Sequence, residues 1–172
     1  MRITKELALT ATFVALLIGA QLALSFVAGV EVVTVLFATF CFFFGVRRGM
    51  VVATVFSLLR CFVFGFFPNV IILYLVYYNL FALIIGLIGK WLNRSVSLKS
   101  LIIVTAAAVV LTVCFTLLDN VVTPLFYSFT KEAAKAYFLT SITAMLPQCV
   151  CSLITVAVLF YPLCKAYSVV RL

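Results

Sequence analysis

The chain has 172 residues, of which 67% are hydrophobic and only 9% are charged, and its mean hydropathy is +1.39. A soluble domain of this length is usually about 45–50% apolar with about 25% charged residues. The composition therefore excludes an ordinary soluble protein and indicates an integral membrane protein. No signal peptide is predicted, because the apolar run behind the charged lead 1–6 is too long for such a segment and has no convincing cleavage site.

Charged and turn residues divide the chain into apolar segments, each long enough for a helix to cross about 30 Å of hydrocarbon. Helices are expected because only helices and closed barrels satisfy the backbone inside a bilayer. We therefore predict an all-α integral membrane protein, a six-transmembrane-helix bundle that forms one domain over residues 1–172. The predicted spans are 7–28, 30–46, 49–67, 70–91, 101–123 and 139–161.

The net charge of +8 is unevenly distributed over the connections between these spans. With the N-terminus inside, only Lys131 and Lys135 lie outside, where Glu132 offsets them. This asymmetry predicts that both termini are cytoplasmic, and it explains the basic charge without nucleic acid. The basic residues on the predicted inner side are Arg2, Lys5, Arg47, Arg48, Lys90, Arg94, Lys99, Lys165 and Arg171.

The longest predicted connection is external. It is the stretch PLFYSFTKEAAKAYF (124–138), which we expect Pro124 to open. Long loops in compact proteins are often lids or binding loops. Whether this loop closes over a site is left open by the sequence.

Polar side chains recur in the predicted outer half of every span, whereas the inner halves are mostly aliphatic. Arg60 stands in VFSLLRCFVFGFFPN (55–69), about 10 Å below the outer surface, where a charge costs roughly 2.5–3.5 kcal/mol. This profile predicts a substrate pocket that opens to the outside. The candidate substrate-binding residues are Gln21, Glu31, Arg60, Tyr74, Tyr77, Tyr78, Asn79, Asp119, Asn120 and Gln148.

Four aromatic residues, Tyr74, Tyr77, Tyr78 and Phe81, stand at i, i+3, i+4 and i+7 and therefore share one helical face. Such rings suit a flat ligand, because they stack on its face while a hydroxyl or amide group reads its edge. The alternatives are an interfacial aromatic belt or ordinary packing.

Two interpretations also remain for the intramembrane charges. Arg60 either forms a structural ion pair with Asp119 or Glu31, or one or more of these residues contact the ligand, as intramembrane charges commonly do. The two are compatible, since a ligand can split an internal pair.

Several kinds of chemistry are not expected. The chain has no histidine, which removes HExxH zinc sites and histidine-based triads. The stretch GLIGKW (86–91) lacks the spacing and the hydroxyl of a P-loop. The six cysteines form no CxxC pair and are predicted to be small buried hydrophobes. We therefore expect neither an enzyme nor a bound metal or cofactor.

Small residues form a stripe on the first span, where Ala8, Ala11, Ala15 and Gly19 recur at i, i+3, i+7 and i+11. Small residues on one face let another helix approach closely in lipid. The stripe serves either packing within the bundle or the docking of a separate membrane subunit.

In its small size, six predicted spans, internal termini and basic inner face, the chain resembles the substrate-binding S components of energy-coupling-factor (ECF) vitamin transporters. The most specific local feature is the AxxxA pattern from Ala11 to Ala15. The stretch FGFFPNVIILYLVYYNLFALIIGLIGK (64–90) is also similar to the third-to-fourth-span region of such proteins.

The resemblance implies a multi-pass protein of the bacterial plasma membrane that captures a vitamin or related micronutrient from outside with high affinity. A membrane coupling subunit would dock on the small-residue face, and two cytoplasmic ATPase subunits would drive delivery inward. The substrate stays open. The alternatives are a stand-alone proton-coupled transporter, with Glu31 or Asp119 as the coupling acid, and a membrane assembly or regulatory subunit.

Overall fold

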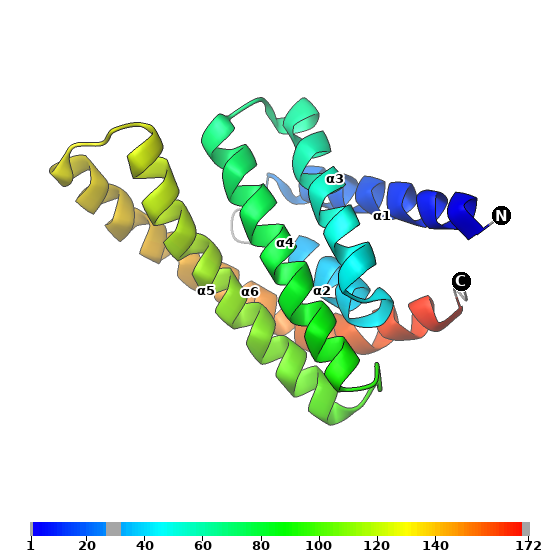
Figure 1. Ribbon diagram of the computed structural model, residues 1–172. Coiled ribbons are helices and arrows are strands. Elements are labelled where there is room, and N and C mark those ends of the chain that lie inside the picture. The colour runs from blue at the N-terminus through cyan, green and yellow to red at the C-terminus, as the bar shows by residue number, and fades with distance from the viewer. Residues whose placement is uncertain (1, 27–31, 170–172) are drawn as a thin grey trace.

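The computed structural model describes residues 2–26 and 32–169. Over these residues the chain is all-helical, with no strand, which confirms the all-α part of the predicted fold class (Figure 1). The helices are α1 (Arg2–Leu24), α2 (Val33–Phe44), α3 (Val46–Phe64), α4 (Pro68–Trp91), α5 (Leu98–Phe126) and α6 (Lys131–Val169).

Four of these helices, α1, α4, α5 and α6, are long and apolar enough to cross a membrane. Helix α2 has only 12 residues, so it is about 18 Å long and too short to cross about 30 Å of hydrocarbon. Helix α3 is longer, with 19 residues, but contains three arginines. The long apolar helices indicate a membrane protein, whereas six spans and cytoplasmic termini stay predictions.

The short helix α2 is the centre of the molecule. It contacts each of the other five helices, and 11 of its 12 residues are buried. Its sequence, VTVLFATFCFFF, is apolar on every side, as expected for a helix surrounded by other helices. An apolar run of this length is more often a buried core helix than a membrane span. The predicted span 30–46 is therefore wrong in length over the described residues.

Glycines on α4 allow the turn between α2 and α3 to approach closely. The turn contains Gly45, whose φ of +87° is readily accessible only to glycine. A Cβ on Gly86 would lie 2.7 Å from the backbone nitrogen of Val46, and a Cβ on Gly89 would overlap the carbonyl oxygen of Phe42. These contacts fix α4 against the central helix.

Helices α5 and α6 form an antiparallel hairpin (Figure 1). The long external loop predicted over 124–138 is wrong, because α5 continues through Pro124 to Phe126 and α6 begins at Lys131. Only residues 127–130 connect the two helices. The stretch KEAAKA at the start of α6 consists of strong helix formers.

The start of α1 and the end of α6 lie on the same side of the molecule, away from the turn between α5 and α6 (Figure 1). On that side, Arg48 Nη2 of α3 forms a 2.9 Å ion pair with Glu6 Oε1 of α1. That the two termini share one side of the membrane stays a prediction, and so does which side that is.

Candidate functional site

Arg60 on α3 is held by side chains from two neighbouring helices. Its Nε donates a 3.1 Å hydrogen bond to Gln21 Oε1 of α1. Its guanidinium carbon lies 4.1 Å from the centre of the Tyr74 ring on α4 and 4.8 Å from that of Phe64, within the range of a cation–π interaction. Gln21 Nε2 in turn donates to the Tyr74 hydroxyl at 3.2 Å. We call Arg60, Gln21 and Tyr74 the Arg60 cluster.

Two ion pairs were considered for Arg60. The one with Asp119 does not form, although the structure describes both residues. The Asp119 carboxylate on α5 instead accepts two 2.6 Å hydrogen bonds, one from the Thr123 hydroxyl and one from the Tyr137 hydroxyl. Glu31, the other candidate partner, lies outside the described residues. Arg60 and Asp119 therefore stand in separate polar clusters.

The hydrogen bonds at Asp119 continue into a chain that joins α4, α5 and α6. Tyr127 Oη donates to Asn69 Oδ1 at 3.2 Å, and Asn69 Nδ2 donates to Thr123 Oγ1 at 3.2 Å. Thr123 Oγ1 donates to Asp119 Oδ1, while Tyr137 Oη donates to Asp119 Oδ2. Hydrogen bonds to an ionised group are shorter and stronger than neutral ones. The network therefore fixes the carboxylate in one orientation.

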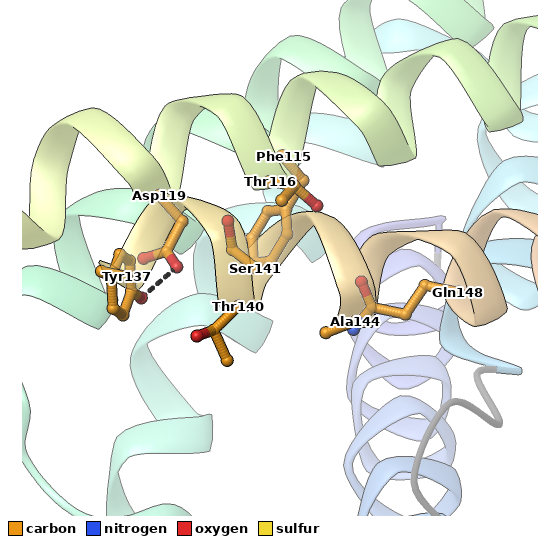
Figure 2. A pocket seen from close by; sticks show the side chains of 8 residues that line it. All are labelled: Phe115, Thr116, Asp119, Tyr137, Thr140, Ser141, Ala144 and Gln148. Atoms are coloured by element: carbon orange, nitrogen blue, oxygen red, sulfur yellow. Dashed lines mark hydrogen bonds between the residues drawn. The ribbon is translucent and has the colours of Figure 1, made fainter. Parts of the chain in front are cut away.

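A pocket of about 230 Å³ lies beside Asp119, between α5 and α6. In Figure 2, Asp119 and Tyr137 lie together toward one end of this α5–α6 pocket and Gln148 lies toward the other. The volume is slightly below the about 300–1,000 Å³ typical of sites for drug-sized ligands, so the pocket suits a small ligand or one part of a larger one. The lining residues are Phe115, Thr116, Asp119, Tyr137, Thr140, Ser141, Ala144 and Gln148.

Phe115 connects this pocket to the Arg60 cluster. Its ring lies edge-on to Tyr77, with centroids 4.7 Å apart, and to Tyr74, with centroids 5.7 Å apart. The Arg60 guanidinium also stacks on the Tyr74 ring. The contact between Tyr74 and Phe115 therefore lies between the Arg60 cluster and the pocket beside Asp119.

The other predicted tyrosines belong to the core. Tyr77, Tyr78 and Phe81 are only 6%, 4% and 1% exposed. Tyr78 and Phe81 pack against Phe37 of the central helix, with centroid distances of 5.4 Å and 5.5 Å. The shared helical face is therefore confirmed, but ordinary packing explains it, and Tyr77 and Tyr78 do not line the α5–α6 pocket.

The two predicted asparagines lie in different places. Asn79 is turned toward α3, where Thr54 Oγ1 lies 3.3 Å from its Nδ2, and the same Nδ2 donates to the Leu75 carbonyl oxygen at 2.9 Å. Asn120 lies between α5 and α6, where its Oδ1 accepts a 2.8 Å hydrogen bond from Ser141 Oγ. Asn120 thus supports the helix pair that forms the pocket, whereas Asn79 does not.

Sequence reasoning missed most of the α6 side of the pocket, because Tyr137 was assigned to a loop. The signal was nevertheless present. The α6 lining residues recur at i, i+3, i+4, i+7 and i+11, which places them on one helical face. They are Tyr137, Thr140, Ser141, Ala144 and Gln148.

The small-residue stripe of α1 is exposed, and one of its members, Ala11, also lines a crevice between α1 and α3. A Cβ on Gly19 would have no neighbour within 4 Å. The opposite face of α1 is buried, through Phe13, Val14 and Leu17. The exposed small residues, Ala8, Ala11, Ala15 and Gly19, therefore do not serve packing within the described part of the bundle.

Among the described residues, no group of three or more His, Cys, Asp or Glu side chains could hold a metal ion. None of the six cysteines, all of which the structure describes, forms a disulfide bond, and three of them, Cys41, Cys61 and Cys164, are buried. Comparisons with protein-family models, with curated proteins and with solved structures find no match to this chain. The α5–α6 pocket and the Arg60 cluster are therefore the features from which its function is inferred.

Proposed function

We propose that the chain is the substrate-binding S component of an ECF-type importer in a bacterial plasma membrane, and that it captures a vitamin or related micronutrient from outside. The observation that carries the proposal is the α5–α6 pocket, where Asp119 and Tyr137 meet in the part of the chain predicted to face outward. Phe115 links this pocket to the Arg60 cluster, so polar groups from five helices gather in one region.

The pocket has the chemistry of a site for a small ligand that is partly aromatic and partly polar. Phe115 offers an aromatic ring, while Gln148 and Thr140 offer an amide and a hydroxyl group. An ionised carboxylate has about four acceptor positions, and Thr123 and Tyr137 occupy two of those on Asp119. A ligand N–H or O–H group would bind the remaining acceptor positions.

Partner subunits would supply delivery and energy. The exposed stripe of Ala8, Ala11, Ala15 and Gly19 supports docking of a membrane coupling subunit, because small residues permit close approach of helices in lipid. ATP hydrolysis would belong to two cytoplasmic ATPase subunits, since no P-loop occurs in the sequence.

The deciding experiment is to purify the chain alone in mild detergent, extract it with acid or solvent, and identify small molecules by mass spectrometry. The proposal expects a vitamin-like compound at close to one molecule per chain. If none co-purifies, a panel of vitamins is tested for a shift in melting temperature. Absence of both a co-purified compound and a shift would overturn the proposal.

A stand-alone proton-coupled transporter is the second candidate, and the position of Asp119 on the pocket favours it. In this mechanism Asp119 would gain and lose the coupled proton. Uptake by the lone chain in ATP-free liposomes under a proton gradient, abolished by Asp119→Asn, would support this candidate and exclude the first. No uptake under these conditions excludes the second.

A further inference from the structure

A larger crevice, of about 650 Å³, lies between α1 and α3 on the side of the molecule where α1 begins. Arg47 and Arg48 stand at the start of α3, and Val55 lies eight residues later on the same helix. At 1.5 Å per residue, the crevice therefore extends about 12 Å along α3 from its charged end to Val55. Leu7 and Val51 line the apolar part as well.

The charged end of this α1–α3 crevice has an excess of positive charge. Arg48 is paired with Glu6 at 2.9 Å, whereas no ion pair or hydrogen bond joins Arg47 to another described residue. A third guanidinium lies near the turn before α3, since a Cβ on Gly45 would be 3.0 Å from Arg94 Nη2. An anionic group at Arg47 would therefore meet net attraction.

The apolar part opens toward the surroundings of the bundle. Leu7 is 65% exposed and Val51 is 48% exposed, so both present hydrocarbon surface where a membrane protein meets lipid chains. A charged end that continues into an apolar channel matches the shape of an amphiphile. A soluble anion would bind only at the charged end and leave the apolar part of the crevice unoccupied.

We propose that the α1–α3 crevice binds one anionic phospholipid, with the phosphate on Arg47 and an acyl chain along Leu7, Val51 and Val55. Guanidinium groups bind phosphate through paired hydrogen bonds. Basic pockets between membrane helices are known sites for anionic headgroups. This site is separate from the α5–α6 pocket and does not depend on the proposed transport function.

The test measures lipid retention by the purified, delipidated chain in micelles containing either phosphatidylglycerol or phosphatidylcholine, by native mass spectrometry and by melting temperature. The proposal expects one phosphatidylglycerol to stay bound, with a higher melting temperature than in phosphatidylcholine. Arg47→Gln should reduce retention at least fivefold. Lys99→Gln, the matched control, should leave it unchanged, because Lys99 is exposed beside Trp91 and outside the crevice.

A second pair of variants tests the apolar channel. Val51→Trp should fill the channel and abolish the selective retention, whereas Val63→Trp, on an exposed position of the same helix outside the crevice, should not. If Val51→Trp does not fold, Leu7→Trp fills the channel from α1.

Three results would overturn the proposal. The first is equal retention of phosphatidylglycerol and phosphatidylcholine. The same result is expected if the crevice binds an acidic protein segment instead of a lipid. The second is an equal loss of phosphatidylglycerol retention in Arg47→Gln and Lys99→Gln, which would indicate that retention depends on the general surface charge. The third is full retention in a folded variant with a filled channel.

Discussion

The hydroxyl group of Tyr137 on α6 donates a 2.6 Å hydrogen bond to Oδ2 of Asp119 on α5. The other carboxylate oxygen accepts a hydrogen bond from the Thr123 hydroxyl, also at 2.6 Å, so the carboxylate group cannot rotate freely. The bond closes the hairpin of α5 and α6 beside the pocket that these two helices line. Loss of the Tyr137 hydroxyl therefore affects the orientation of the carboxylate more than the shape of the pocket.

The first prediction concerns Tyr137→Phe, which removes the hydroxyl and keeps the ring. A buried hydrogen bond to a charged group contributes about 1.5–3 kcal/mol, and solvent reduces this contribution at half-buried Asp119. We therefore expect the less firmly oriented carboxylate to cost about 1 kcal/mol of ligand-binding free energy. The affinity for the compound identified by mass spectrometry should fall roughly five- to tenfold, as measured by calorimetric titration. Tyr161→Phe, at an exposed position on α6 outside the pocket, should bind like the unmodified chain. Equal affinities for both variants would contradict a role for Tyr137.

The second prediction separates the Arg60 cluster from Asp119 by two double-mutant cycles. Arg60→Ala combined with Gln21→Ala should show a coupling energy within the about 0.5–3 kcal/mol range of contacting residues, because Nε of Arg60 donates to Gln21. Arg60→Ala combined with Asp119→Asn should be additive within about 0.5 kcal/mol. The free energy of unfolding in mixed micelles is the measurement. A larger coupling with Asp119 than with Gln21 would show that the ion pair forms after all.

How much of the fold was predictable is best seen at α2. The pattern of apolar runs between charged residues predicted the helical class and the approximate positions of all six helices. It did not predict that α2 is a short buried helix, because residues 27–46 are almost entirely apolar and nothing in their pattern marks Val33 as the start. A buried core helix and a membrane span have the same apolar composition.

The depth of a residue within its predicted span was enough to identify part of the site. Asp119 and Gln148 were chosen for depth and do line the pocket. Asn79 was chosen with Tyr78, but adjacent residues on a helix point about 100° apart, and Asn79 faces α3 instead. Tyr137 was missed because Pro124 was taken as the end of a helix, whereas a proline is tolerated within membrane helices.

The third prediction concerns the close approach of α4 to the central helix. Gly89→Ala places a methyl group against the carbonyl oxygen of Phe42. Because backbone cannot move as freely as a side chain, the variant should lose about 1–3 kcal/mol of stability, which is typical of overpacking. The matched control is Gly19→Ala, which meets no atom within 4 Å and should gain about 0.5–1 kcal/mol from helix propensity. Melting temperatures in detergent that move in the same direction for both variants would contradict the packing described for Gly89.

The fourth prediction tests the exposed face of α1 and rests on the proposed transport function. Ala15 is exposed on the stripe of small residues, and leucine there would keep a partner helix at a distance. Ala15→Leu should therefore abolish substrate uptake in cells that contain the coupling and ATPase subunits, while the purified variant keeps its ligand affinity and melting temperature. Ala157→Leu makes the same change at an exposed position on α6 and should leave uptake intact. Normal uptake by Ala15→Leu would remove this face from the docking surface. Simultaneous loss of uptake, binding and thermal stability would show instead that Ala15 supports the fold.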